Sequence, residues 1–396
     1  MTPVDALVCR RCGRSYAHGD VEYTCPEHEG VAGILDVRYD DSDADATLPT
    51  GSIADLWAFE PWLPVSGDPV RLGAGGTPLL DAPALSAELG VETLVKDETG
   101  NPTGSNKDRA SAVVVSRARQ LGHETVACAS TGNAAASLAG YAARADLDCR
   151  IFVPEGIPDA KAVQPRLYGA RVEAVAGGYG DAYEQCRTIA AERGWYNCNA
   201  AMNPYALEGM RTLGFELARQ VPGADWVAMP MGNGCSLAAV RKGLHEFERR
   251  GVIDDAPRML GVQAAGTTPI YDRFVAERRD GRAEDKARER GLADGSGETT
   301  ADSIDVRVPH NAAAACDALR ESGGDAVVVG DDAIVDAQAQ LGATEGVFVE
   351  PASAAAVAGV REAVDSGTVG PDERVVVVAT GSGLKDTATA REAVEK

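Results

Sequence analysis

Short apolar runs alternate with longer helical stretches along most of the chain, and this alternation is the clearest pattern in the sequence. Small or turn-forming residues bound the runs, which is typical of buried strands. The runs lie at residues 125–129, 151–153, 226–230, 260–264, 347–349 and 375–379. Strands that alternate with helices predict parallel βα units. We therefore predict an α/β protein built on parallel sheets.

Three of the predicted strands open into segments suited to binding a ligand, and two of these segments are suited to an anion. Residues 130–133 and residues 231–236 each lead into a predicted helix, whose first N–H groups lack intrahelical acceptors. Glycines in the second loop let the backbone approach a phosphate group. Thr380 follows the last strand, at the carboxyl edge of the sheet where α/β proteins bind ligands. The small residues of 130–133 are equally compatible with a tight turn that packs a helix on a sheet.

Lys107 stands between a turn sequence and an Ala/Val-rich segment, residues 110–120, that predicts a helix. The turn is Asn-Pro-Thr-Gly at residues 101–104, where proline fixes φ and glycine accepts conformations closed to other residues. Burial lowers the pKa of a lysine ammonium, and the free amine then forms a Schiff base with a carbonyl. A lysine taken alone in this position is an ordinary solvated side chain. Lys107 therefore indicates a catalytic role only in combination with other motifs.

Four potential metal ligands are clustered near the N-terminus. Cys9 and Cys12 form a C-x2-C knuckle, and Cys25 and His28 form a C-x2-H knuckle after a gap of twelve residues. Three thiolates and one imidazole at this spacing predict a closed, structural zinc site in a ribbon-like segment, residues 1–38. The alternative is that Cys9 and Cys12 are a redox pair or the remnant of a metal site.

Composition narrows the classes of function. The chain has 396 residues, enough for two or three domains, and 60 acidic against 38 basic residues give a net charge of −22. This balance argues against a nucleic-acid partner, and a lysine-poor, acidic surface of this kind is halophile-like. No apolar run reaches membrane-spanning length and the N-terminus lacks a signal-peptide core, so we expect no membrane partner and a cytoplasmic location. Residues 40–52 are predicted to form a linker, and residues 271–289 a solvated helix or mobile insert.

In chain order, the motifs resemble those of the threonine synthase family of fold-type II pyridoxal-phosphate (PLP) enzymes. The shared segments lie at residues 75–79, 101–109, 130–133, 203–212, 231–236 and 380–386. The resemblance implies an N-terminal zinc ribbon and two parallel-sheet domains with PLP in the cleft between them. The large domain would comprise residues 39–110 and 213–396, and the small mobile domain residues 111–212. The resemblance also implies a homodimer and a small amino-acid substrate.

The resemblance assigns roles to individual residues. Lys107 would hold PLP covalently and act as the catalytic residue, Asn133 would lie beside the cofactor's 3′-oxygen, and Thr380 would hydrogen-bond its pyridine nitrogen. The cofactor phosphate would be held by Gly232, Asn233, Gly234, Cys235 and Ser236. The substrate carboxylate would be held by Ser130, Thr131 and Gly132. The implied reaction converts O-phosphohomoserine and water to threonine and phosphate.

Three positions depart from the family pattern. Asn106 stands where an aromatic residue is expected, Ala206 where an arginine is expected, and Ser382 where many threonine synthases have histidine. Arginine binds phosphate bidentately, so Ala206 weakens the case for a phosphorylated substrate. A serine or threonine dehydratase, or another β-elimination or β-replacement enzyme, is the alternative. A zinc-ribbon interaction protein on an inactive PLP scaffold is the non-enzymatic alternative.

Overall fold

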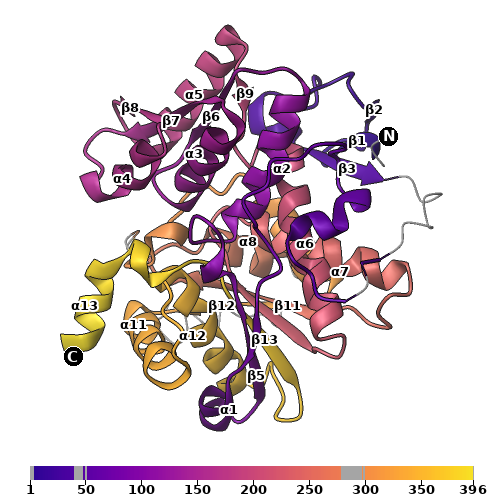
Figure 1. Cartoon of the computed structure of the whole chain (residues 1–396). Helices are drawn as coiled ribbons and strands as arrows, with labels where there is room; N and C mark the ends of the chain where they lie inside the picture. The colour runs from indigo at the N-terminus through magenta and orange to yellow at the C-terminus, as the bar shows by residue number, and fades with distance from the viewer. Residues whose placement is uncertain (1–3, 40–47, 50, 278–296, 298, 396) are drawn as a thin grey trace. The chain divides into compact units, whose positions relative to one another are not determined.

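The computed structural model describes residues 4–39, 48–49, 51–277, 297 and 299–395, and Figure 1 labels most of its helices and strands. The chain divides into two compact units. Unit 1 consists of Met1–Gly76 and Asn101–Thr212, and unit 2 consists of Thr77–Gly100 and Leu213–Lys396. The predicted domains group residues 39–76 and 101–110 with the second unit instead, and they stay a prediction, since compactness alone does not define a part that moves.

Unit 1 begins with a three-stranded antiparallel sheet, which we call the ribbon (residues 4–39). Its strands, β1 (Val4–Cys9), β2 (Ser15–Ala17) and β3 (Leu35–Tyr39), have the order β2-β1-β3. A 3-10 helix, Leu56–Trp62, follows the ribbon in the described chain and buries Trp57, Phe59 and Trp62.

The rest of unit 1 is a parallel α/β layer. Its sheet has the order β8-β7-β6-β9, with the strands β6 (Thr125–Ala129), β7 (Asp148–Pro154), β8 (Arg171–Val175) and β9 (Tyr196–Asn197). The helices are α2 (Lys107–Gln120), α3 (Asn133–Ala145), α4 (Asp159–Leu167), α5 (Tyr179–Arg193) and the first part of α6 (Pro204–Gln220). Alanines along α3 allow it to pack closely, and its core-facing residues are buried.

Unit 2 is built on a six-stranded sheet of order β12-β11-β10-β13-β5-β4, in which only the pairing of β4 with β5 is antiparallel among the described strands. The strands are β4 (Leu79–Asp81), β5 (Glu92–Asp97), β10 (Trp226–Pro230), β11 (Arg258–Ala264), β12 (Asp325–Val329) and β13 (Arg374–Ala379). The α-helices are α1 (Pro83–Leu89), α7 (Cys235–Arg249), α8 (Pro269–Glu277), α10 (Ala312–Glu321), α11 (Asp331–Gln340), α12 (Pro351–Asp365) and α13 (Thr387–Glu395).

The core of unit 2 lies around its central strands. The side chains of Val375 and Val377 on β13 are fully buried and pack with alanines and valines of α12. Strands of a parallel sheet are covered on both faces, which explains why β13 is an unbroken run of valines. Because β10 and β13 are paired in parallel, their carboxyl ends lie next to each other at one edge of the sheet.

The predicted α/β class is confirmed, and five of the six predicted strands correspond to β6, β7, β10, β11 and β13. The prediction of a strand at 347–349 is wrong, because only an isolated bridge between Val349 and Ser382 forms there. Gly346, in the left-handed region, and Pro351, at the start of α12, bound this segment, which is joined to residues 381–383 by two backbone hydrogen bonds. The predicted linker at 40–52 and the predicted charged insert at 271–289 lie largely outside the described residues. None of the helices in the described part of the chain has the length and apolar character of a membrane span.

Candidate active site

Lys107 is the first residue of α2 and follows a loop that its neighbours hold in shape. The backbone N–H and the hydroxyl of Thr103 both donate to the carboxylate of Asp108, each at 2.6 Å. Asn101 Oδ1 accepts a hydrogen bond from Gly75 N at 3.0 Å, which ties the loop to the glycine-rich segment before it. Asn106 and Asp108 are buried, whereas Lys107 between them is half-buried. The motif therefore presents the lysine at a helix start on a fixed loop.

Arg109 connects α2, the helix that begins at Lys107, to α6 within unit 1. Its guanidinium is fully buried and donates to the hydroxyl of Thr212 at 3.0 Å. Gly209 lies against the same turn, and a Cβ at that position would be 2.0 Å from the carbonyl oxygen of Arg109. Only glycine permits this approach, so the glycine of the 203–212 segment sets the spacing between the two helices.

The 130–133 loop joins the end of β6 to the start of α3. Ser130 N donates to Phe152 O on β7 at 3.2 Å, and Gly132 N lies 3.3 Å from Ser130 Oγ. Gly132 is the N-cap of α3, and Ser130, Thr131, Gly132 and Asn133 are all half-buried. The loop thus presents the N-terminal end of a thirteen-residue helix, as expected for a site that binds a carboxylate.

In unit 2, residues 231–236, which we call the glycine loop, connect β10 to the first turn of α7. Met231 N donates to Val262 O at 2.8 Å, and Asn233 Oδ1 accepts from His310 N at 3.2 Å, so both ends of the loop are anchored. Gly234 has φ of +83° and caps α7, the fifteen-residue helix that starts at Cys235. A Cβ at Gly234 would lie 2.8 Å from the Cβ of Ala315, so a side chain there has no room.

Thr380 lies at the same edge of the unit 2 sheet as the glycine loop, because β10 and β13 are paired parallel neighbours. Its hydroxyl is 2.8 Å from Ser353 Oγ, at the start of α12. Ser353 Oγ also accepts from Gly381 N at 2.9 Å. The structure therefore places two of the predicted cofactor-binding elements, residues 232–236 and Thr380, at one end of one sheet, and it fixes the Thr380 hydroxyl by a neighbouring serine.

The donor groups of unit 2 fit a bound PLP. The first N–H groups of an α-helix have no acceptor within that helix, and the start of α7 therefore suits a phosphate dianion. Asn311 O would lie 3.1 Å from a Cβ on Gly234, and the buried amide nitrogen of Asn311 has no hydrogen-bond partner among the described residues. A buried donor left over beside a glycine loop is consistent with an additional partner there.

The four predicted metal ligands come together in the ribbon of unit 1. The candidate ligand atoms of Cys9, Cys12, Cys25 and His28 all lie within 4.8 Å of one another. Two knuckles of the antiparallel sheet bring them together, as their spacing predicts. The arrangement has the composition of a closed, four-ligand zinc site.

Ala206 and Arg211 bear on whether a second phosphate can be bound. Ala206 is buried on α6. Arg211 Nε lies 3.0 Å from the carboxylate of Glu208, its guanidinium lies 4.0 Å from the centroid of the Tyr39 ring, and it donates to Trp62 O. Arg211 is thus a buried structural residue, and it does not replace the arginine that the family pattern places at position 206.

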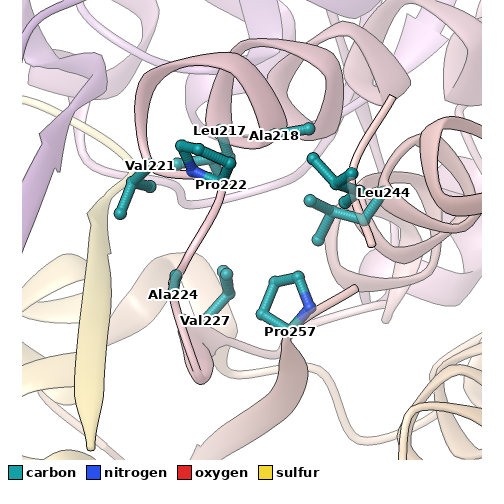
Figure 2. A pocket seen from close by; sticks show the side chains of 9 residues that line it. Leu217, Ala218, Val221, Pro222, Ala224, Val227, Leu244 and Pro257 are labelled. Carbon is teal, nitrogen blue, oxygen red and sulfur yellow. The ribbon is translucent and has the colours of Figure 1, made fainter. Parts of the chain in front are cut away.

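An apolar pocket of unit 2, shown in Figure 2, is not the candidate site. Its lining consists of Leu217, Ala218, Val221, Pro222, Ala224, Val227, Leu244, Ile253 and Pro257. The pocket lies where β10 and β11 begin, whereas the glycine loop and Thr380 lie where parallel strands end. Because every lining residue is apolar, it offers no side chain to hold a carboxylate or a phosphate.

Some residues that shape the site were not identified from the sequence. Asp108 reaches back to Thr103, and Ser353 orients Thr380, but neither contact has a spacing rule that predicts it. The position of Ser353 just after Pro351 predicts only a helix start. The hydrogen bonds show that Asp108 holds the loop before Lys107 and that Ser353 holds the Thr380 hydroxyl.

Comparison with known proteins agrees with these features. The family model described as "Pyridoxal-phosphate dependent enzyme" matches residues 70–381. The chain is 41% identical to the threonine synthase of Methanocaldococcus jannaschii, over 98% of this chain and 95% of that protein. It is 40% identical to the threonine synthase of Methanosarcina acetivorans, over 98% and 94%, and 39% identical to that of Mycobacterium leprae, over 84% and 89%.

Solved structures show the same fold at low identity. The processed form of threonine deaminase isoform 2 from Solanum lycopersicum superposes with a TM-score of 0.65 at 23% identity, covering 81% of this chain and 87% of that one. Maize serine racemase gives a TM-score of 0.66 at 20% identity, covering 81% and 92%. These similarities support the architecture alone.

Proposed function

Because the chain belongs to the threonine synthase family of PLP-dependent enzymes, we propose that it converts O-phosphohomoserine and water to threonine and phosphate. The observation that carries this proposal is the identity of 40–41% with two proteins named threonine synthase, which extends over 98% of the chain. The proposal is also supported by the arrangement, each within its own unit, of the loop before Lys107, the glycine loop and Thr380.

Five groups of residues would act on cofactor and substrate, and Thr380 is the last of them. PLP, when bound, supplies an electron sink that stabilises negative charge on the substrate carbons. Lys107 would hold the cofactor and then move protons at the substrate Cα and Cβ, for which its place at a fixed helix start is suited. Residues 232–236 would hold the cofactor phosphate, and Asn133 would contact the cofactor's 3′-oxygen. Residues 130–132 would orient the substrate through its carboxylate.

The Thr380 hydroxyl would face the pyridine nitrogen of the cofactor. A hydroxyl does not keep that nitrogen protonated as a carboxylate does, which favours elimination and replacement over transamination. Ser353, 2.8 Å from Thr380 Oγ1, would fix the direction of this hydroxyl. The Thr380–Ser353 pair therefore matches the lyase chemistry of the family.

A β-elimination activity on unphosphorylated serine or threonine is the second candidate. It is favoured by Ala206, and by the buried contacts of Arg211 with Glu208 and Tyr39. Incubating the holoenzyme separately with O-phosphohomoserine, threonine and serine separates the two functions. Release of phosphate with formation of threonine supports the first, and release of ammonia with a keto acid supports the second. Lys107→Ala should lose either activity while keeping its circular dichroism spectrum, and substantial turnover by this variant contradicts the proposed role.

We further propose that Cys9, Cys12, Cys25 and His28 bind structural zinc. Their clustering within 4.8 Å supports the assignment. Protein purified without chelator should contain about one zinc per chain, as expected for a four-ligand site. A fully folded, metal-free protein would contradict it.

Other proposals concern assembly and location. We propose a cytoplasmic homodimer in which residues 111–212 move when substrate binds, as the family resemblance implies. Light scattering after size-exclusion chromatography tests the dimer. Hydrogen exchange of this segment with and without substrate tests the movement.

A further inference from the structure

The ribbon contacts the α/β layer of unit 1 through a tyrosine located beside the last strand of that layer. Tyr23 Oη accepts a hydrogen bond from the backbone N–H of Asn197 at 2.9 Å. The Tyr23 ring lies 5.6 Å from the ring of Tyr196, measured between centroids. Tyr196 and Asn197 form β9, so the ribbon is fixed directly to an edge strand of the sheet.

Two asparagines continue this contact, Asn197 at the end of β9 and Asn199 beyond it. The strand pairs with β6 only at Val126↔Tyr196 and Ala127↔Asn197, whereas β6 runs on to Ala129. The Asn199 side chain takes the place of the missing strand, because its Oδ1 accepts from Ala129 N at 2.9 Å. A pleated edge without a partner strand leaves this N–H unpaired, and the amide oxygen satisfies it.

The Asn199 side chain is itself held by Asn197. Asn197 Oδ1 accepts from Asn199 N at 3.0 Å and from Asn199 Nδ2 at 2.9 Å. Both asparagines are buried, at 2% and 5% exposure, where an unpaired amide is costly. Tyr23, Asn197, Asn199 and Ala129 therefore form one continuous series of hydrogen bonds.

Ala129 is the last residue before the 130–133 loop. On the other side of β6, Ser130 N donates to Phe152 O of β7. The base of the loop is thus held by a strand on one side and by the Asn199 amide on the other. The Tyr179 hydroxyl also donates to Ala129 O at 3.4 Å, so a shift of Asn199 disturbs one of several attachments at the base of the loop.

We propose that Tyr23, Asn197 and Asn199 are positioning residues through which the ribbon sets the geometry of the 130–133 loop. The inference rests on the proposed function in one respect, the assignment of that loop to the substrate carboxylate. Loss of the series loosens the loop without touching Lys107 or the glycine loop. Because carboxylate binding contributes to ground state and transition state alike, its weakening raises KM and leaves kcat nearly unchanged.

Tyr23→Phe is the test, and Tyr39→Phe is its matched control. Both variants delete one phenolic hydroxyl from the ribbon, but the Tyr39 hydroxyl donates to Glu208 of α6, at 2.6 Å, and has no part in the series. Hydrogen exchange of the substrate-free holoenzyme is followed in peptides that contain residues 126–133. Tyr23→Phe should speed exchange in these peptides and raise KM by about threefold to tenfold, as expected for one hydrogen bond. Tyr39→Phe should leave both unchanged.

Asn199→Ala provides a second variant that acts at the other end of the series. It should speed exchange at Ala129 at least as much as Tyr23→Phe does, with melting temperatures of all variants recorded. Unchanged exchange in Tyr23→Phe, or equal changes in Tyr23→Phe and Tyr39→Phe, would overturn the proposal. If the wild type releases no phosphate from O-phosphohomoserine, the proposed function fails on its own, while the exchange measurements still decide whether the ribbon positions the loop.

Discussion

Replacing Lys96 by methionine would leave a carboxylate without its cation in the interior of unit 2. Lys96, on β5, is fully buried, and its ammonium donates to Glu216 Oε2 at 2.7 Å, to Thr77 O at 2.7 Å and to Gln220 Oε1 at 2.8 Å. All three donors are therefore used, and Glu216 is equally buried. Methionine fills similar volume, so the variant removes the charge and its hydrogen bonds with little change in packing.

The expected cost follows from burial. Breaking a buried ion pair by removing one partner costs about 3–5 kcal/mol, because the remaining charge is uncompensated. Arg374 and Glu92 form an ion pair of the same length, 2.7 Å, but their side chains are 39% and 56% exposed. An exposed pair contributes about 0–1 kcal/mol. Arg374→Met is therefore a control that matches Lys96→Met in distance and differs from it in burial.

Urea unfolding followed by circular dichroism measures the difference. With an m-value of about 3 kcal/mol/M, Lys96→Met lowers the midpoint by roughly 1–1.7 M, and Arg374→Met lowers it by less than about 0.3 M. Adding salt should shrink the effect of Arg374→Met and leave that of Lys96→Met, since ions screen only accessible charges. The double variant Lys96→Met/Glu216→Gln should regain much of the loss. Equal midpoints for the two single variants, or a double variant no better than Lys96→Met, would refute the explanation by an uncompensated buried charge.

Other outcomes can be checked with similar means. Burial raises the pKa of Glu373, but hydrogen bonds from its neighbours outweigh it and hold the pKa below the ordinary value, so this carboxylate stabilises the fold above its unfolded pKa; Glu373→Gln should be less stable than wild type at pH 7, and the gap measured by urea unfolding should close as pH falls below about 4.5. Burial raises the pKa of Cys149 to about 12, so iodoacetamide at pH 8 should label the exposed Cys12 in metal-free protein well before Cys149, as read by peptide mass spectrometry. Gly234→Ala should reduce the bound PLP measured by absorbance at least tenfold, because the new Cβ would lie 2.8 Å from Ala315 and φ is +83°; full PLP content would contradict the assigned phosphate loop.

Much of the fold was predictable because its strands are apolar runs that end at small residues. Valine-rich β13 and the run before residues 130–133 have few alternatives to a buried strand. Lys107 was placed correctly at a helix start, since the turn residues before it interrupt any regular structure. The failed strand at 347–349 shows the limit of apolar content as a signal, because three consecutive apolar residues form only an isolated bridge there.

The supporting contacts of the site were not predictable in the same way. Asn199 and Ala129 are 70 residues apart, and no local pattern links an asparagine after one strand to the end of another. The structural use of Arg211 depends on Tyr39, which comes from the ribbon. Such pairings depend on which surfaces meet in three dimensions, and a single sequence does not contain that information in any short spacing.

During synthesis of the chain, the ribbon leaves the ribosome well before the strand to which Tyr23 attaches it. Tyr23 precedes its partner Asn197 by 174 residues, which at ordinary elongation rates is a delay of roughly 9–35 s. During that interval the ribbon lacks the β9 strand to which Tyr23 attaches it. All four clustered ligands lie within the first 28 residues, so a captured metal ion would let this segment fold at once and await the rest of its own protein.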